Sequence, residues 1–479
     1  MRTLRVGVLV CGLLVLAVVT GRGQDHTPAV LASIEANHDR YAQLARRIWD
    51  LAEVGYRETE SAALLQQELR SAGFGIEPGV AGMPTSFVAS YGEGQPVIAI
   101  LAEYDALPGI TQDAVAERRP LPAKEAGHAC GHNLFGTAST AAGIAVKEWM
   151  VRSGAKGTIR VYGTPAEEGG AGKVYMVREG LFRDVDAVLH WHAGALNDAS
   201  PGSSLANLSA KFRFHGLSAH AAGAPERGRS ALDGVEAFNH MANLMREHVP
   251  EDTRIHYVIT NGGAAPNVVP DFAEVYYYVR HPDPKEVAQI FPRLVKAAEG
   301  AALGTGTTVD HEIIHGVYSM LRNDALARVM DRNLRKVGGI QYTPEEQAFA
   351  ERIRPTLGGD VPPVAVTSRI EPFEPKEAGG STDVADVSWV VPTTGLYTAT
   401  WVPGTPSHSW QALATSGTSI GVKGMLLAAK TLSLTAIDLF RDARTLSEAK
   451  AEHRKRVGPD FVYRALVGNR PPPLDYRAK

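Results

Sequence analysis

The run Val97-Ile98-Ala99-Ile100-Leu101-Ala102 is apolar at every position, and the charged residues Glu103 and Asp105 follow it closely. Such a short, unbroken apolar run predicts a strand that is buried on both faces of a sheet. Similar runs occur on either side of it along the chain, at residues 86–91, 158–163 and 187–190. Helical stretches such as 137–151 separate them, and this alternation predicts an α/β domain with helices on both faces of its sheet. Polar ligand groups in such sheets collect in loops at the carboxyl ends of the strands.

The rhythm of the sequence changes between residues 205 and 318. Stretches typical of strands and helices follow the order β-α-β-β-α-β there, at residues 204–214, 230–248, 254–260, 273–280, 285–302 and 307–314. This is the order of a ferredoxin-like unit of about 110 residues. A chain of 479 residues also exceeds what one hydrophobic core usually organises. We therefore expect a domain at 205–318 inserted into a larger α/β domain made of residues 28–204 and 319–479. The tail, which contains the prolines 471–473, is expected to be peripheral.

The composition is that of an ordinary soluble globular protein, with 44% hydrophobic and 21% charged residues. The formal net charge is −3. Binding to nucleic acid requires a concentrated Lys/Arg surface, so we expect no nucleic-acid partner.

The N-terminus has the pattern of a signal peptide. Arg2 and Arg5 precede an almost continuous apolar run at 6–19, and small and polar residues follow at 20–24. An apolar run of this length is short for a membrane span and suits a signal peptide at 1–24; an uncleaved anchor is the alternative. The expected location is periplasmic or secreted, with no other membrane association.

Cysteine usage directs attention to one residue. Cys11 lies within the signal segment, so Cys130 would be the single cysteine of the mature chain and could not form an internal disulfide. Taken alone, Cys130 could be a buried cysteine without a functional role, a reactive thiol or a metal ligand. Its neighbours His128 and His132 lie in a glycine-containing turn, and thiolate and imidazole are preferred ligands of Zn²⁺.

Further potential ligands follow other predicted strands. Glu167 and Glu168 come after the run at 158–163, and adjacent residues leaving a strand point in different directions. One carboxylate can therefore bind metal while the other takes a proton from water; alone, the pair could be a solvated turn. His190 and His192 end the strand that begins near 187, and His408 lies in a loop after a strand-like stretch at 396–402. A single histidine is usually structural, but this many donors at strand ends indicate a metal site.

These segments resemble the M20 family of metallopeptidases, and most of all its amidohydrolase branch, which includes p-aminobenzoyl-glutamate hydrolases and auxin-conjugate hydrolases. Asn133, where the auxin-conjugate enzymes usually carry Asp, favours the former. The resemblance implies a mixed-sheet, phosphorylase/hydrolase-like catalytic domain with an inserted dimerisation lid. The motifs occur in the family's order, at residues 103–108, 128–133, 164–170, 191–192, 216–221, 267–270, 380–384 and 404–410.

The resemblance also implies roles for individual residues. Two divalent metal ions, Mn²⁺ or Zn²⁺, would be bound by Cys130, His132, Glu168, His192 and His408. Cys130 would bridge the two ions, Glu167 would be the general base, and Asp105 would orient an imidazole or the loop. Glu103 stands where many members have a ligating His, and we favour a buried carboxylate over a ligand there.

The expected enzyme is a homodimeric amidase that cleaves an N-acyl or N-aroyl amino acid, and p-aminobenzoyl-glutamate is the favoured substrate. His220 would reach the partner subunit's active site, and Asn267 and Arg280 would bind the substrate's carboxylate; structurally, Asn267 could only shape a turn and Arg280 could be a surface charge. A dipeptidase, an aminoacylase or an auxin-conjugate hydrolase would share the same metal chemistry. Two other classes remain, a non-catalytic binding protein and a thiol enzyme with Cys130 as nucleophile.

Overall fold

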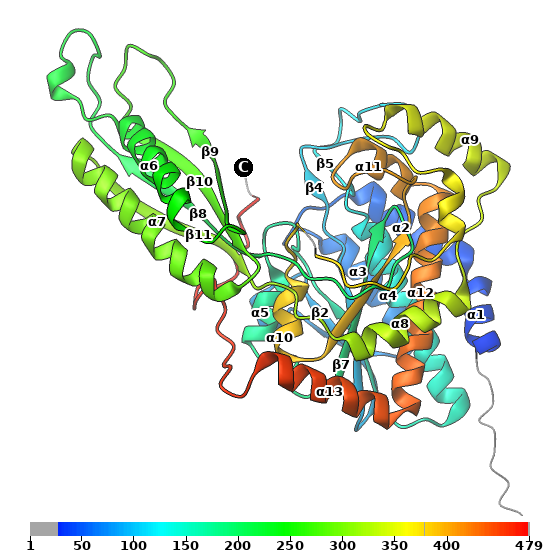
Figure 1. Ribbon diagram of the computed structural model, residues 1–479. Helices are drawn as coiled ribbons and strands as arrows, with labels where there is room; N and C mark the ends of the chain where they lie inside the picture. The colour runs from blue at the N-terminus through cyan, green and yellow to red at the C-terminus, as the bar shows by residue number, and fades with distance from the viewer. Residues whose placement is uncertain (1–26, 378, 478–479) are drawn as a thin grey trace, which may run out of the picture.

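The computed structural model describes residues 27–377 and 379–477. The predicted signal peptide at 1–24 lies outside these residues. Figure 1 shows a large body in which a sheet lies between helices, and an arm of strands and helices that projects from it. The predicted α/β fold class with an inserted ferredoxin-like unit is confirmed.

The large body is built on a six-stranded mixed sheet with the order β1-β2-β6-β3-β7-β12. Strands β6, β3, β7 and β12 are parallel, whereas β1 and β2 pair antiparallel at one side. Because the four parallel strands run the same way, their carboxyl ends lie at one edge of the sheet. The strands are β1 Gly75–Pro78, β2 Phe87–Glu93, β3 Val97–Ala102, β6 Gly157–Gly163, β7 Ala187–Gly194 and β12 Thr393–Ala399.

Helices cover both faces of this sheet, because strands such as β3 have apolar side chains on both faces. Ile98 and Ile100 pack into one hydrophobic cluster, whereas Ala99 and Leu101 pack into another on the opposite face, as the alternation of side chains along a strand requires. The first face is covered by α1 Thr27–Ala36, α2 His38–Leu51, α3 Thr59–Ser71, α4 His132–Ser153, α8 Asp324–Val337, α12 Ser419–Arg441 and α13 Ala443–Val457. The second face is covered by α5 Gly172–Arg178 and α10 Val384–Val390.

Shorter elements complete the large body. They are β4 Leu107–Pro108, β5 Ala126–Gly127, α9 Pro344–Ile353, α11 Trp410–Ser416 and the 3₁₀ turns η1 Val80–Gly82, η4 Arg354–Thr356 and η5 Val364–Ser368.

The arm is a four-stranded antiparallel sheet with the order β11-β8-β10-β9. Its elements follow the predicted β-α-β-β-α-β order: β8 Ala206–His215, η2 Pro225–Arg227, α6 Ala231–Met245, η3 Arg246–His248, β9 Arg254–Asn261, β10 Phe272–His281, α7 Pro284–Thr305 and β11 Thr308–Val317. Apolar side chains such as Phe212, Phe214 and Tyr277 face the two helices and form the core of the arm. The alternate residues of the same strands, which include Ser209, Tyr278 and Arg280, lie on the other face.

Helix α12 is long and apolar enough to span a membrane by length and composition. However, 83% of its most apolar window is buried inside the protein, between α4, α8 and the sheet. We therefore interpret α12 as a core helix of the large body.

Candidate metal centre and substrate pocket

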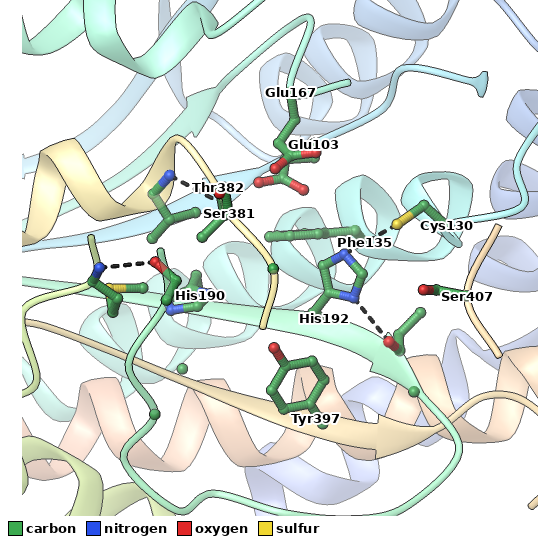
Figure 2. Close-up of a pocket in the computed structure, with 18 of the residues that line it drawn as sticks. Glu103, Cys130, Phe135, Glu167, His190, His192, Ser381, Thr382, Tyr397 and Ser407 are labelled. Carbon is green, nitrogen blue, oxygen red and sulfur yellow. Dashed lines mark hydrogen bonds between the residues drawn. The ribbon is translucent and has the colours of Figure 1, made fainter. Parts of the chain in front are cut away.

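A pocket of about 690 Å³ opens at the carboxyl ends of the parallel strands. Glu103 follows β3, Glu167 and Glu168 follow β6, and His192 lies near the end of β7. All four residues line the pocket, and Figure 2 shows Glu103, Glu167 and His192 around it. The loops that carry these polar residues thus meet at the carboxyl ends of the strands, as predicted from the sequence.

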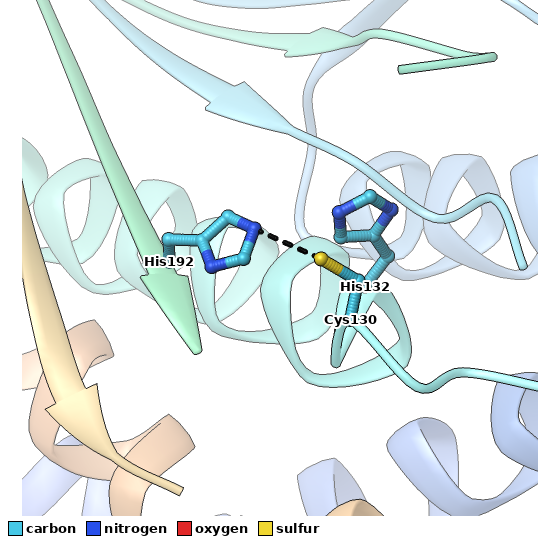
Figure 3. A group of neighbouring side chains, drawn as sticks. All are labelled: Cys130, His132 and His192. Atoms are coloured by element: carbon cyan, nitrogen blue, oxygen red, sulfur yellow. Dashed lines mark hydrogen bonds between the residues drawn. The ribbon is translucent and has the colours of Figure 1, made fainter. Parts of the chain in front are cut away.

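Cys130, His132 and His192 form one group of potential metal ligands (Figure 3). Cys130 Sγ lies 3.4 Å from His192 Nε2, and one ligand atom from each residue lies within 4.8 Å of the others. Gly131 makes this approach possible, because a Cβ at this position would lie 2.5 Å from the Ala193 Cβ. The N-terminus of α4 therefore packs directly against the end of β7.

Cys130 also belongs to a second group, with Glu168 and His408. His408 Nε2 lies 3.4 Å from Glu168 Oε1. The Cys130 sulfur is thus shared by two adjacent sets of three donors, which is the arrangement expected of a bridging ligand. The structure therefore brings together all five predicted ligands.

The donor atoms fit divalent cations. His132 Nε2 and Glu168 Oε1 are buried, and neither makes a hydrogen bond of normal geometry within the described residues. Their neighbours are Glu103 Oε2, 3.1 Å from His132 Nε2, and His408 Nε2, 3.4 Å from Glu168 Oε1. Buried polar atoms without a well-formed hydrogen bond are costly, and a cation would supply a further partner. Thiolate, imidazole and carboxylate together suit Zn²⁺ and other first-row metals.

Asp105 contacts one residue of each of the two donor groups. Its Oδ1 lies 2.9 Å from His132 Nδ1, and its Oδ2 accepts a hydrogen bond of 2.9 Å from the Glu168 backbone N–H. With Nδ1 held by Asp105, the other ring nitrogen of His132, Nε2, is the one available to the donor groups. Partners of this kind set the orientation of metal-binding imidazoles, which is the role predicted for Asp105.

Glu103 belongs to a third group, with His132 and Glu167. Its Oε1 lies 2.7 Å from Lys173 Nζ, and its Oε2 lies 3.1 Å from His132 Nε2. Lys173 on α5 is fully buried and also pairs with Asp383 at 2.6 Å. Lys173 was not predicted from the sequence; its position shortly after the Glu167–Glu168 motif is the one signal that could have indicated it. Since Lys173 neutralises Glu103, the geometry favours a structural carboxylate over a metal ligand.

Glu167 is surrounded by negative charge. Burial, the Glu103 carboxylate and then the Glu168 carboxylate raise its pKa well above the ordinary value. The loop that carries it begins with Ala166 in the left-handed region (φ 58°), and Glu58 Oε1 accepts a 2.8 Å hydrogen bond from the Ala166 N–H. Glu58, which no motif indicated, is fully buried. A carboxylate in this setting can take up and hold a proton, as a general base must.

Three predicted substrate-binding residues lie on the arm, but the structure brings only one of them to the pocket. Arg280 lines the pocket, and its guanidinium lies 5.2 Å from the centre of the Tyr278 ring. His220 and Asn267 are exposed and do not line it. They lie in neighbouring loops, where the Ala221 N–H donates to the Asn267 carbonyl at 3.0 Å. Within one chain, these two residues do not contribute to the pocket.

Comparisons with known proteins give relatives over most of the chain. Residues 99–383 match Peptidase family M20/M25/M40. A p-aminobenzoyl-glutamate hydrolase subunit from Escherichia coli K12 is 43% identical over 88% of this chain and 94% of its own. The Xaa-Arg dipeptidase of Mus musculus is 28% identical over 88% of this chain and 91% of its own. A dinuclear metal-binding peptidase of the M20 family from Bacillus subtilis superimposes with a TM-score of 0.57 at 17% identity, covering 85% of this chain and 99% of its own.

Proposed function

Because this chain belongs to peptidase family M20 and is a hydrolase of amide or peptide bonds, we propose that it is a metal-dependent amidase that releases the amino acid from an N-acyl or N-aroyl amino acid. The observation that carries the proposal is the pair of donor groups that share Cys130, with Glu167 beside them on the pocket wall. The 43% identity to a p-aminobenzoyl-glutamate hydrolase makes p-aminobenzoyl-glutamate the first substrate to test.

The residues that would hold two divalent cations, Mn²⁺ or Zn²⁺, are Cys130, His132, Glu168, His192 and His408. When bound, such cations polarise a carbonyl and make water a better nucleophile at neutral pH. Glu167 would take a proton from the attacking water at its carboxylate and later donate it to the leaving amine nitrogen. Its raised pKa suits a group that must keep this proton between the two steps.

Arg280 would bind the carboxylate of the substrate. Its Nε is buried without a hydrogen bond, and Arg280 makes no ion pair within the described residues. Burial lowers its pKa, as expected for a cation that lacks an anionic partner. A carboxylate would supply that partner through a bidentate pair.

We propose further that the enzyme is a homodimer and that His220 and Asn267 act in the partner's site. Strand β9 is an edge of the arm sheet, and its Tyr257, Val258 and Ile259 are exposed. A partner strand would cover this apolar edge. Size-exclusion chromatography with light scattering should give a dimer for the wild type and a monomer for Val258→Lys, with Val151→Lys, on exposed α4 surface, as the control. A dimeric Val258→Lys variant would exclude this interface.

Treatment with a chelator distinguishes a metal-dependent enzyme from a thiol enzyme that uses Cys130 as nucleophile. Burial, followed by the Glu168 carboxylate, raises the pKa of the Cys130 thiol, which opposes a free thiolate nucleophile. We expect activity on p-aminobenzoyl-glutamate, acyl amino acids or dipeptides to disappear with a chelator and to return with Mn²⁺ or Zn²⁺. Activity that persists after complete metal removal, and is lost only on alkylation, would refute the metal proposal.

A non-catalytic binding protein is disfavoured, because Glu167 and the five expected donors are all present. We also propose that the chain is exported, on the pattern of residues 1–24 alone. The N-terminal sequence of the protein recovered from the periplasm or medium tests this; recovery of the intact chain from the cytoplasm would oppose it.

A further inference from the structure

The C-terminal tail after α13 crosses from the large body to the arm and back to the catalytic loop. Figure 1 shows it in red, beside the arm sheet near its end. Arg470 Nη1 donates to the Ile314 carbonyl of β11 at 3.4 Å, and Arg178 of α5 donates to the Arg470 carbonyl at 2.6 Å. The expectation that the tail is peripheral is therefore wrong.

Tyr476 and Arg477 of the tail contact the loop that carries Glu167 and Glu168. Tyr476 Oη donates to the Glu168 carbonyl oxygen at 3.0 Å, and Arg477 Nη2 donates to the same oxygen at 2.5 Å. Arg477 also lines the pocket. Two side chains separated from Glu168 by about 300 residues of chain thus converge on one backbone oxygen beside the candidate metal centre.

This loop needs external partners because its backbone is irregular. Ala166, Gly169 and Ala171 have φ values of 58°, 92° and 56°, and left-handed alanines are unfavourable without support. Side chains from other segments support the loop by hydrogen bonds to its backbone N–H and carbonyl groups, one after another. Glu58 accepts from the Ala166 N–H, Asp105 accepts from the Glu168 N–H, and Tyr56 Oη donates to the Gly170 carbonyl. The tail supplies the donors for the Glu168 carbonyl, which lies between the last two.

The docking site for the tail is shaped to accept it. A Cβ on Gly55 would lie 2.3 Å from Tyr476 Oη and 2.9 Å from the Ala166 Cα, so the glycine leaves room for both the tyrosine hydroxyl and the loop. The Tyr476 ring packs edge-on against Tyr56, with centroids 5.7 Å apart. A Cβ on Gly169 would lie 3.5 Å from Arg477 Nη2, an ordinary contact distance. The close fit is therefore on the Tyr476 side of the contact.

We propose that Tyr476 and Arg477 are positioning residues of the active site: by donating together to the Glu168 carbonyl, they hold the loop in the conformation that aims Glu167 into the pocket. The expected effect of Tyr476 and Arg477 on kcat rests on the proposed amidase function. Their effect on the order of the loop does not depend on that function.

Hydrogen exchange tests the ordering directly and needs no substrate. The double variant Tyr476→Phe/Arg477→Met removes both donors and keeps the packing volume. In metal-free protein, amides of the peptide that spans residues 164–171 should exchange about 10-fold faster in this variant than in the wild type. Asp475→Asn, an exposed neighbour on the tail, should exchange like the wild type. Equal exchange in the double variant and the wild type would overturn the proposal.

Kinetics tests the consequence. In the double variant, assayed with saturating Mn²⁺ or Zn²⁺ so that variant and wild type are equally loaded, kcat should fall roughly 10- to 100-fold because Glu167 is misplaced, while KM changes less than about 3-fold and Tm stays at the wild-type value. Restoring one donor, as in Tyr476→Phe/Arg477→Lys, should recover part of kcat. An unchanged kcat, or a loss that follows metal content or Tm, would overturn the positioning role. Wild-type protein without amidase activity would refute the proposed function instead, and the exchange experiment would still decide the ordering.

Discussion

Glu167 and Glu168 are neighbours in the chain but have opposite electrostatic environments. Burial raises the pKa of both carboxylates. For Glu167, the Glu103 and Glu168 carboxylates raise the pKa further, whereas for Glu168 the His408 and His132 imidazoles outweigh burial and lower it. At the residue scale, this difference supports the proposed roles of a proton carrier and a metal ligand. The position of two adjacent identical residues in the sequence does not show which of them takes which role.

Glu167→Gln tests the proton carrier. The amide cannot take a proton but keeps the size and polarity of the side chain, so metal content should be unchanged while kcat falls by about 10²–10⁴-fold. Steady-state kinetics together with elemental metal analysis measures both quantities. Glu93→Gln, on exposed strand surface, is the matched control and should behave as wild type. Full activity in Glu167→Gln would eliminate Glu167 as the base.

Asp105→Ala tests the support behind the ligands. It removes the contact to His132 Nδ1 and the acceptor of the Glu168 N–H together, so metal affinity should fall about 10- to 100-fold. Titration of the metal-free protein with Zn²⁺ or Mn²⁺ against a competing chelator measures it. Asp252→Ala, in an exposed turn of the arm, should leave the affinity unchanged; equal affinities for both variants would show that Asp105 does not orient the ligands.

The positions of several donors near strand ends predicted a metal site, and the resemblance to the M20 family selected Cys130, His132, Glu168, His192 and His408 among them. Neither was sufficient to identify Lys173, Glu58 or Tyr476. These residues act through tertiary contacts with segments far along the chain, and no local pattern marks them. The roles of His220 and Asn267 stay predictions, because a single chain does not contain the contacts that they would make.

At the scale of elements, the central strand β3 connects the two cores of the large body. It lies between β6 and β7, and its side chains enter the cores on both faces of the sheet. Its apolar sequence therefore predicted its position correctly. The helices were harder to place, because which face each helix covers depends on contacts between distant segments.

Ile100→Ala should destabilise the protein by about 2–5 kcal/mol, because Ile100 is fully buried and its truncation leaves a cavity. Urea unfolding of the metal-free protein gives the free energy of unfolding. Val151→Ala is the control; Val151 is 57% exposed, and the change should stay within about 0.5 kcal/mol. A loss at Ile100 no larger than at Val151 would contradict the central placement of β3.

Helix α10 carries a buried acid whose charge should make stability depend on pH. Asp386 accepts hydrogen bonds from the Tyr318 N–H and from Tyr463 Oη, and burial is the main cause that raises its pKa to about 7. The unfolded value is about 3.9, so the folded state binds more protons between the two values. The stabilising contribution is full below about pH 4 and is lost as the pH rises through 7.

Asp386→Asn should remove this dependence. Relative to the variant, the wild type should lose about 1.4 kcal/mol of unfolding free energy per pH unit between pH 5 and 7. Urea unfolding of metal-free protein at several pH values measures the difference. Parallel pH profiles for the two proteins would show that Asp386 does not carry a raised pKa.

At the scale of the whole molecule, the large body holds the candidate metal centre while the arm holds His220 on exposed loops. The proposed dimer would bring each arm to the other subunit's pocket. His220→Ala should therefore reduce kcat without loss of metal.

Mixing His220→Ala with Glu167→Gln tests this sharing. A heterodimer would contain one site with both native residues, so random mixing should restore about a quarter of wild-type activity. The measurement is kcat after the two inactive proteins are unfolded and refolded together, with each variant refolded alone as the control. No recovery despite demonstrated heterodimers would place His220 outside the partner's site.

Helix α12 has a consequence for the proposed export of the chain. During the proposed export, the unfolded chain would carry the apolar segment of α12 through the export machinery. That segment resembles a stop-transfer sequence. Lys423 and Lys430, which pair with Glu346 and Glu35 in the folded protein, interrupt that stretch. A lysine at the centre of a membrane helix opposes insertion by roughly 2.5–3.5 kcal/mol. Lys430 lies near the middle of α12, so it would oppose retention of this segment in the bilayer and favour complete translocation, although the helix as a whole is apolar enough for the core.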